Sequence, residues 1–193
     1  MAERGGGVMA LEEPAIIVVS GVQGAGKSTV ARALAERFSR AVHIEADTLQ
    51  RMIVSGGEWT TEPGEPPGEA ARQLRLRLRN ACLLARSFFD AGFTAVVDDI
   101  IIGERFDDLR ADLAGLRFRL VVLAPDVETA IARDAAREYT VGEKWARYLD
   151  EEQRRTMAGS GLWVDSSGQT AAETVEEVMS RLRDEGLVES EAS

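Results

Sequence analysis

The sequence has one cysteine, one histidine and no long hydrophobic run. The single cysteine, Cys82, cannot form a disulfide within the chain and lies in the apolar pattern NACLLA, so we interpret it as a core residue of a protein from a reducing compartment. No segment offers the roughly 20 consecutive apolar residues that span a bilayer, and residues 1–14 lack the apolar stretch of a signal peptide. We therefore expect a cytoplasmic protein with no membrane partner.

Basic residues are fewer than acidic ones. The chain has 23 Lys and Arg against 33 Asp and Glu, a formal net charge of -10 at pH 7. Proteins that follow nucleic-acid phosphates need a basic surface, so we do not expect a nucleic-acid partner. The arginines within 72–79 could still line a local basic groove, although we interpret them as a solvated face paired with acids. They are Arg72, Arg75, Arg77 and Arg79.

Short apolar runs alternate with longer amphipathic segments, which is typical of a parallel sheet with helical crossovers. We expect strands at 16–19, 42–45, 94–98, 119–123 and 162–164. We expect helices at 27–38, 69–91, 104–113, 127–138 and 170–183. The alternating LRLRLR would suit a strand, but the wider pattern around it has helical spacing. The 193 residues suit one domain, which we place at 14–185 between disordered tails at 1–13 and 186–193.

Two segments are expected to shape an acceptor site. Residues 52–68 carry most of the prolines and several glycines, and long loops inside compact domains are usually lids or binding loops. Trp59 in this acceptor loop either contacts the acceptor or pins the loop to the core. The segment 133–155 suits a mobile lid, because Arg133 and Arg137 share one helical face and can stabilise the charge that develops on a transferred phosphate.

Residues 21–28, GVQGAGKS, fit the Walker A pattern G-x-x-x-x-G-K-[ST] and follow the apolar run AIIVV. Gly24 and Gly26 let backbone amides surround a phosphate at the start of a helix. We expect Lys27 to reach the β and γ phosphates of ATP and the Ser28 hydroxyl to ligate Mg²⁺. The predicted nucleotide-binding residues are Gly21, Gln23, Gly24, Ala25, Gly26, Lys27, Ser28 and Thr29.

Acidic residues follow two other expected strands, at the edge where ligands gather in open α/β sheets. Asp47 could accept a proton from an incoming hydroxyl or align it for attack, or it could cap a helix together with Gln50. Arg51, one turn later, could contact substrate or form a surface ion pair. Successive strand residues point to opposite faces, so we assign Asp98 to the metal and Asp99 to the acceptor.

Two further features have a structural and a functional interpretation. His43, in the second expected strand, is interpreted as a core or edge residue, because nothing near it in sequence suggests a triad or a metal site. The polar turn VDSSGQT follows the last expected strand. It either lies near the adenine of a nucleotide or caps the next helix.

The segments SGVQGAGKST, EADTL, VVDDI and LWVDSSGQTAAETVEEV, with the arginine-bearing lid, resemble small P-loop phosphotransferases. That family is typified by chloramphenicol 3-O-phosphotransferase and belongs to the wider shikimate, gluconate and adenylate kinase group. The resemblance covers about residues 16–183 and implies an α/β P-loop kinase fold, with a five-stranded parallel sheet of order 2-3-1-4-5, flanking helices and a helical lid. It implies ATP, Mg²⁺, a catalytic carboxylate at Asp47, the double aspartate at Asp98 and Asp99, and lid arginines at Arg133 and Arg137.

The expected function is transfer of the γ-phosphate of ATP to a hydroxyl group of a small molecule, such as an antibiotic or another natural product. The loop at 52–68 does not match the chloramphenicol enzyme, so the acceptor stays open. Two alternatives are a nucleotide-dependent switch or ATPase that acts on a protein partner, and a nucleic-acid 5′-hydroxyl kinase. The lack of a glutamate after Asp98 disfavours hydrolysis, and the net charge disfavours nucleic acid. The sequence leaves the oligomeric state open.

Overall fold

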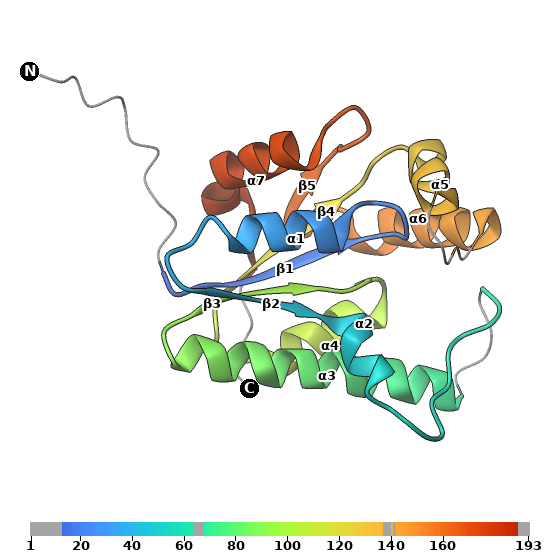
Figure 1. Cartoon of the computed structure of the whole chain (residues 1–193), viewed down its shortest axis with the longest axis horizontal. Helices are drawn as coiled ribbons and strands as arrows, with labels where there is room; N and C mark the ends of the chain where they lie inside the picture. The colour runs from blue at the N-terminus through green and yellow to red at the C-terminus, as the bar shows by residue number, and fades with distance from the viewer. Residues whose placement is uncertain (1–12, 64–67, 137–139, 141, 189–193) are drawn as a thin grey trace, which may run out of the picture.

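Helices cover both faces of one central sheet (Figure 1). The computed structural model describes residues 13–63, 68–136, 140 and 142–188. The strands are β1 (Ile16–Gly21), β2 (Ala41–Glu45), β3 (Thr94–Asp98), β4 (Phe118–Leu123), β5 (Leu162–Val164) and β6 (Leu187–Val188). The helices are α1 (Lys27–Ala35), α2 (Ala46–Arg51), α3 (Glu69–Asp90), α4 (Glu104–Asp112), α5 (Val127–Ala135), α6 (Glu143–Met157) and α7 (Ala171–Glu185).

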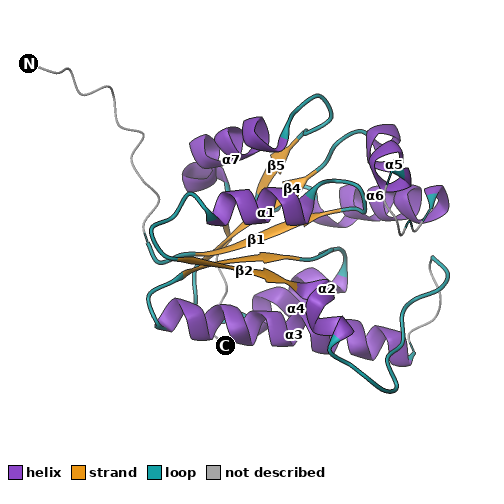
Figure 2. Cartoon of the chain, in the orientation of Figure 1, coloured by secondary structure: helices purple, strands orange, loops and turns teal. Residues whose placement is uncertain are grey.

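Five strands run parallel in the order β2-β3-β1-β4-β5, which confirms the predicted topology. The register places Val19 of β1 and Glu45 of β2 beside Asp98 of β3. The three strands therefore end at the same edge of the sheet, and the segments that follow them meet there. Figure 2 shows this edge, with helix α2 directly beyond the end of β2.

The two core layers follow from the alternation of β1 side chains. Ile17 and Val19 pack in one buried cluster with residues of α1 and α7. Ile16 and Val18 pack in a second cluster with residues of α3 and α4. Each such side chain contributes roughly 1.5–3 kcal/mol when fully buried, so both helical layers are held against the central strand.

The structure corrects the predicted elements in four places. Ala46–Arg51 forms α2, which is too short to give a periodic signal, and Glu143–Met157 forms α6 within the predicted lid. Leu187–Val188 was expected to belong to a tail, yet it pairs antiparallel with β4 as β6. The predicted helix 127–138 ends at Ala135, and 137–139 lie outside the described residues. So do residues 1–12 and 189–193 of the predicted tails.

Helix α3 resolves the ambiguous LRLRLR pattern in favour of a helix. Its buried face carries Leu78, Ala81, Cys82 and Ala85, whereas Leu76 is half exposed. None of the described helices is both long and apolar enough to cross a bilayer.

Cys82 is predicted to be chemically inert in the folded protein. It is 2% exposed, and burial raises the pKa of its thiol to about 12. Because the thiolate is the reactive form, we expect little alkylation by iodoacetamide at about pH 8 without denaturant and complete alkylation with it. Mass spectrometry of the two samples provides the measurement, and rapid labelling of the native protein would contradict the prediction.

Candidate active site

The phosphate-binding loop connects the end of β1 to the start of α1. Gly26 is the N-cap of α1, with φ of 93°. A helix N-terminus presents unpaired amide groups and positive partial charge, which suits an anion. Lys27 Nζ donates to the carbonyl oxygen of Val22 at 3.0 Å, so the ammonium group folds back onto the loop. The loop thus has the backbone and the cation that phosphate binding requires.

Gly24 satisfies two separate constraints in this loop. Its φ of 75° lies in the left-handed region, which favours glycine. A Cβ atom at this position would also lie only 2.0 Å from the carbonyl oxygen of Ala130 in α5. The loop therefore packs backbone against backbone with helix α5.

Asp98 joins the P-loop to the ends of β3 and β2. Ser28 Oγ donates to Asp98 Oδ2 at 2.7 Å, and His43 Nε2 lies 2.6 Å from Asp98 Oδ1. The two residues predicted to hold the metal are therefore in contact. His43, interpreted from the sequence as a core or edge residue, is the partner of one of them.

The Ser28 and Asp98 oxygens are hard donors of the kind that Mg²⁺ prefers. Within the described part of the chain, no group of three or more His, Cys, Asp or Glu side chains is placed to hold a metal ion. The site therefore fits an ion that takes its remaining ligands from phosphate and water, as Mg²⁺ does in nucleotide sites.

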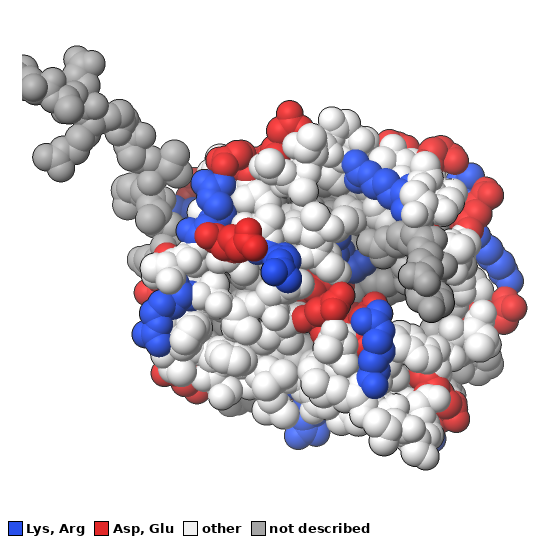
Figure 3. Space-filling model, in the orientation of Figure 1, with Lys and Arg blue, Asp and Glu red and all other residues white. Residues whose placement is uncertain are grey.

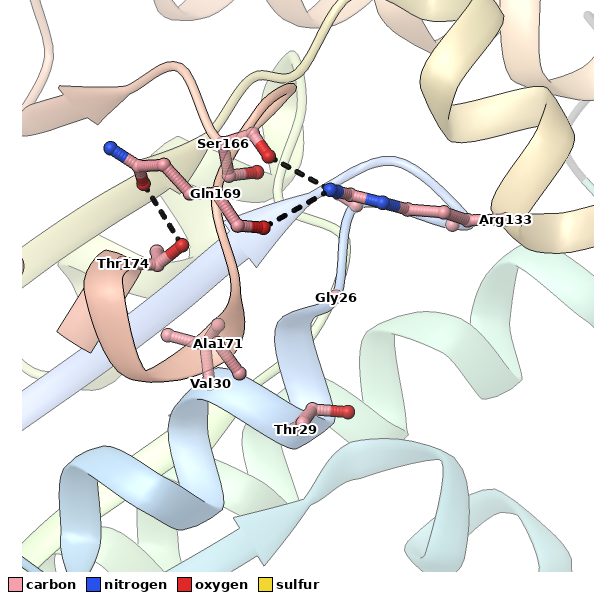
Figure 4. A pocket seen from close by; sticks show the side chains of 10 residues that line it. Gly26, Thr29, Val30, Arg133, Ser166, Gln169, Ala171 and Thr174 are labelled. Atoms are coloured by element: carbon pink, nitrogen blue, oxygen red, sulfur yellow. Dashed lines mark hydrogen bonds between the residues drawn. The ribbon is translucent and has the colours of Figure 1, made fainter.

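A pocket of about 270 Å³ lies beside the P-loop (Figure 4). It is lined by the loop itself, by the start of α1 and by the turn that follows β5. Arg133 of α5 reaches across it, and its Nη2 donates to the carbonyl oxygens of Ser166 at 2.9 Å and Gln169 at 3.4 Å. The same nitrogen also lies 3.2 Å from the carbonyl oxygen of Ser167. The guanidinium is thus bound to the turn that follows β5, and its expected role in stabilising a transferred phosphate stays a prediction. Arg137 lies outside the described residues.

The turn VDSSGQT caps the next helix, as one of its two interpretations predicted, and it also lines the pocket, while its contact with an adenine stays a prediction. Ser166 and Gln169 line the pocket. Thr170 caps α7, because Thr170 Oγ1 accepts from the backbone N–H of Glu173 at 3.3 Å while Glu173 Oε2 accepts from the N–H of Thr170 at 2.8 Å. The Ser166 hydroxyl is buried and has no partner among the described residues, so it is free to bond a ligand.

Asp47 begins a chain of ion pairs that we call the acceptor-side network, consisting of Asp47, Arg77, Asp99 and Arg105. Asp47 lies in the first turn of α2 and is half exposed, and its Oδ1 accepts from Arg77 Nη1 at 2.7 Å. Arg77 Nη2 donates to Asp99 Oδ1, and Arg105 Nη2 donates to Asp99 Oδ2 at 2.5 Å. The network runs from α2 through α3 and the end of β3 to α4.

Asp99 and Arg77 do not have the places that the sequence predicted. The Asp99 side chain is 1% exposed and also accepts from the N–H of Ile100 at 2.8 Å, so it is an internal counter-ion and not a substrate contact. Arg77 is 5% exposed rather than part of a solvated face. Burial lowers the pKa of the Arg105 guanidinium, while Asp99 opposes that shift.

Two buried glutamines hold the acceptor loop. Gln73 Oε1 accepts from the N–H of Glu58 at 2.7 Å, and Gln73 Nε2 donates to the carbonyl oxygen of Gly56 at 2.7 Å. Gln50 Nε2 donates to the carbonyl oxygen of Glu58 at 3.1 Å. Gln50 is therefore engaged with the loop, and the N-cap of α2 is Glu45, so the capping box considered for Asp47 does not form.

Trp59 is 48% exposed and does not pin the acceptor loop to the core. Its contact with an acceptor stays a prediction, as does the contact of Arg51, which is exposed at the end of α2. Sequence reasoning missed His43, Gln73 and Arg105. The residue types of His43 and Arg105 were visible in the sequence, but only the tertiary contacts show which acids they meet.

The comparisons with known proteins agree with this architecture. Residues 16–161 match the family model described as AAA domain. A sugar kinase from Janibacter sp. HTCC2649 is 21% identical with a TM-score of 0.63, covering 85% of this chain and 91% of that chain. A gluconokinase from Sinorhizobium meliloti 1021 is 23% identical with a TM-score of 0.61, covering 89% and 93%.

A shikimate kinase from Acinetobacter baumannii, in complex with shikimate, is 18% identical with a TM-score of 0.60, covering 86% of this chain and 90% of that chain. No curated protein matches the chain. At these identities the likeness establishes a P-loop kinase fold.

Substitution of Gly24 tests the close packing of the P-loop on α5. Gly24→Ala adds a clash to the left-handed strain, whereas Gly115→Ala, with φ of 79° and open space around its Cβ, adds the strain alone. We expect Gly115→Ala to lower the free energy of unfolding by about 1–2 kcal/mol and Gly24→Ala to lower it clearly further. Urea unfolding of both variants provides the measurement, and equal losses would disprove the close contact.

Proposed function

Since the chain belongs to the AAA domain family, as the match over residues 16–161 shows, we propose that it is an ATP-dependent phosphotransferase that moves the γ-phosphate to a hydroxyl group of a small molecule. The observation that carries this proposal is the connection between the phosphate-binding loop and Asp47. Ser28 of the loop binds Asp98, and the next residue, Asp99, binds Arg77, which holds Asp47. A phosphate site and a half-exposed carboxylate thus share one edge of the sheet.

The nucleotide side of the reaction is carried by the P-loop. Its amides and the N-terminus of α1 would orient the phosphates, and Lys27 would leave the carbonyl of Val22 for the β and γ phosphates. Ser28 and Asp98 would hold Mg²⁺, which when bound neutralises charge between the β and γ phosphates. The pocket beside Arg133 would take the rest of the nucleotide, with Ser166 as a hydrogen-bond donor.

The acceptor side is carried by Asp47. Its Oδ1 is held by Arg77, and the half-exposed side chain leaves a carboxylate oxygen for the hydroxyl of the acceptor. Asp47 would take the proton of that hydroxyl or align its oxygen for in-line attack on the γ-phosphate. Trp59 and Arg51, both exposed near this edge, are the proposed acceptor contacts.

The identity of the structural neighbours supports a small acceptor, because they are a sugar kinase, a gluconokinase and a shikimate kinase. The resemblance to chloramphenicol 3-O-phosphotransferase extends the proposal to an antibiotic or another natural product. A cytoplasmic location, where ATP and Mg²⁺ are available, agrees with the buried, unpaired Cys82.

No observation specifically favours either alternative function, the nucleotide-dependent switch or the nucleic-acid 5′-hydroxyl kinase. On the face shown in Figure 3, acidic and basic side chains are interspersed and form no continuous basic band, whereas a nucleic-acid kinase needs one along its substrate. Within the predicted basic groove, Arg75 is paired with Asp108 and Asp112, and Arg77 is buried.

The first prediction of this proposal is acceptor-dependent ADP formation. We expect Mg-ATP to give ADP and a phosphorylated product with at least one member of a panel of hydroxyl compounds: sugars, sugar acids, nucleosides, aminoglycosides and chloramphenicol. Product mass identifies the acceptor, and Lys27→Ala provides the blank. Steady ADP formation without any acceptor, abolished in Lys27→Ala, would indicate the switch instead.

The second prediction concerns Asp47. Asp47→Asn keeps the shape of the side chain but removes its basicity, so we expect the transfer rate to fall by about 10²–10⁴-fold. ATP affinity, measured by calorimetry, should stay within about twofold because the P-loop is intact. An unchanged transfer rate would exclude Asp47 from the mechanism.

A further inference from the structure

We propose that Arg77, fixed from behind by Asp99 and Arg105, is the positioning residue that sets the orientation of the Asp47 carboxylate, and that it does not bind the acceptor. This inference rests on the proposed function and assigns a role to three residues that lie outside the P-loop. In this role the acceptor-side network fixes the Asp47 carboxylate relative to the end of β3.

The burial gradient along the network supports this role. Asp99 is 1% exposed and Arg77 5% exposed, whereas Asp47 is 51% exposed. The guanidinium of Arg77 is planar and rigid, and its two terminal nitrogens are divided between the two carboxylates. Asp99 holds the Nη2 atom of Arg77, so the Nη1 atom points in one fixed direction, toward Asp47.

Asp99 in turn cannot move freely. Three donors saturate it: Arg77, Arg105 and the N–H of Ile100. A buried carboxylate with this many bonds would leave unpaired charge if it rotated. Because Asp99 directly follows Asp98, which binds Ser28, its position is tied to the P-loop. The orientation of the Asp47 carboxylate is therefore fixed relative to the P-loop.

The same contacts argue against Arg77 as an acceptor ligand. Each terminal nitrogen donates to an internal carboxylate, and the Arg77 side chain is only 5% exposed. An acceptor therefore finds little of the guanidinium within reach. Arg77 therefore acts on the reaction through Asp47.

The test is a double-mutant cycle between Asp99→Asn and Asp47→Asn. Asp99→Asn removes the charge that fixes Arg77 and keeps the volume, so we expect kcat to fall about 10–100-fold, the range for a misplaced reacting group, with the KM for ATP unchanged. If Asp99 acts through Asp47, the double variant should be no slower than Asp47→Asn alone. Arg105→Gln, at the far end of the network, should give a smaller fall in the same direction.

Asp112→Asn is the matched control. Like Asp99, Asp112 binds an arginine of α3: its carboxylate lies 2.5 Å from Arg75 Nη1. This ion pair connects α3 to α4, but among the described residues Arg75 forms no ion pair with Asp47. A general loosening of the two helices would slow Asp112→Asn as much as Asp99→Asn. That result, or losses from Asp99→Asn and Asp47→Asn that multiply in the double variant, would overturn the positioning role while leaving the phosphotransferase intact.

A readout independent of activity separates the two proposals. The carboxyl ¹³C resonance of Asp47, assigned with Asp47→Asn, should shift in Asp99→Asn and stay in place in Asp112→Asn. If the wild-type protein transfers phosphate to no acceptor, the proposed function fails, and this resonance still decides whether the network sets the environment of Asp47. A resonance unmoved in Asp99→Asn would refute the inference.

Discussion

Because successive strand residues point to opposite faces, Asp98 and Asp99 at the end of β3 approach different partners. Asp98 binds Ser28 and His43, whereas Asp99 is buried between Arg77 and Arg105. A buried carboxylate is costly unless it is paired and hydrogen-bonded. The fold must therefore keep α3 and α4 against this strand end, and two consecutive residues connect the P-loop to the network that holds Asp47.

Patterns of local origin were readable from the sequence. The P-loop is a contiguous motif after an apolar strand, and the alternation of apolar runs with amphipathic segments predicted a parallel sheet with helical crossovers. The order β2-β3-β1-β4-β5 followed from the resemblance to small P-loop phosphotransferases. The strand rule also separated Asp98 from Asp99 correctly in direction. The rule did not predict that Asp99 is buried. Alternation indicates the face of the sheet to which a side chain points, and it does not indicate whether that face is open to an acceptor or filled by arginines.

The missed features depend on contacts between distant residues. Arg77 lies in an alternating Leu-Arg run in which every arginine has the same local surroundings, and only the docking of α3 beside Asp47 and Asp99 distinguishes it. Trp59 was expected to be either an anchor or a contact, yet the loop is held by the amides of Gln50 and Gln73. Glutamine is polar and adds nothing to a hydrophobic pattern, so the burial of Gln50 and Gln73 cannot be recognised from the sequence.

The two ends of this sheet edge are held by different kinds of contact. Around the P-loop, backbone amides at the start of α1 and the carbonyls bound by Arg133 lie beside the side chains of Ser28 and Asp98. On the acceptor side the loop and the carboxylate are held by the side chains of Gln50, Gln73 and Arg77. Chains that are 18–23% identical share the fold with TM-scores of 0.60–0.63, so the arrangement of strands and helices does not depend on most individual side chains.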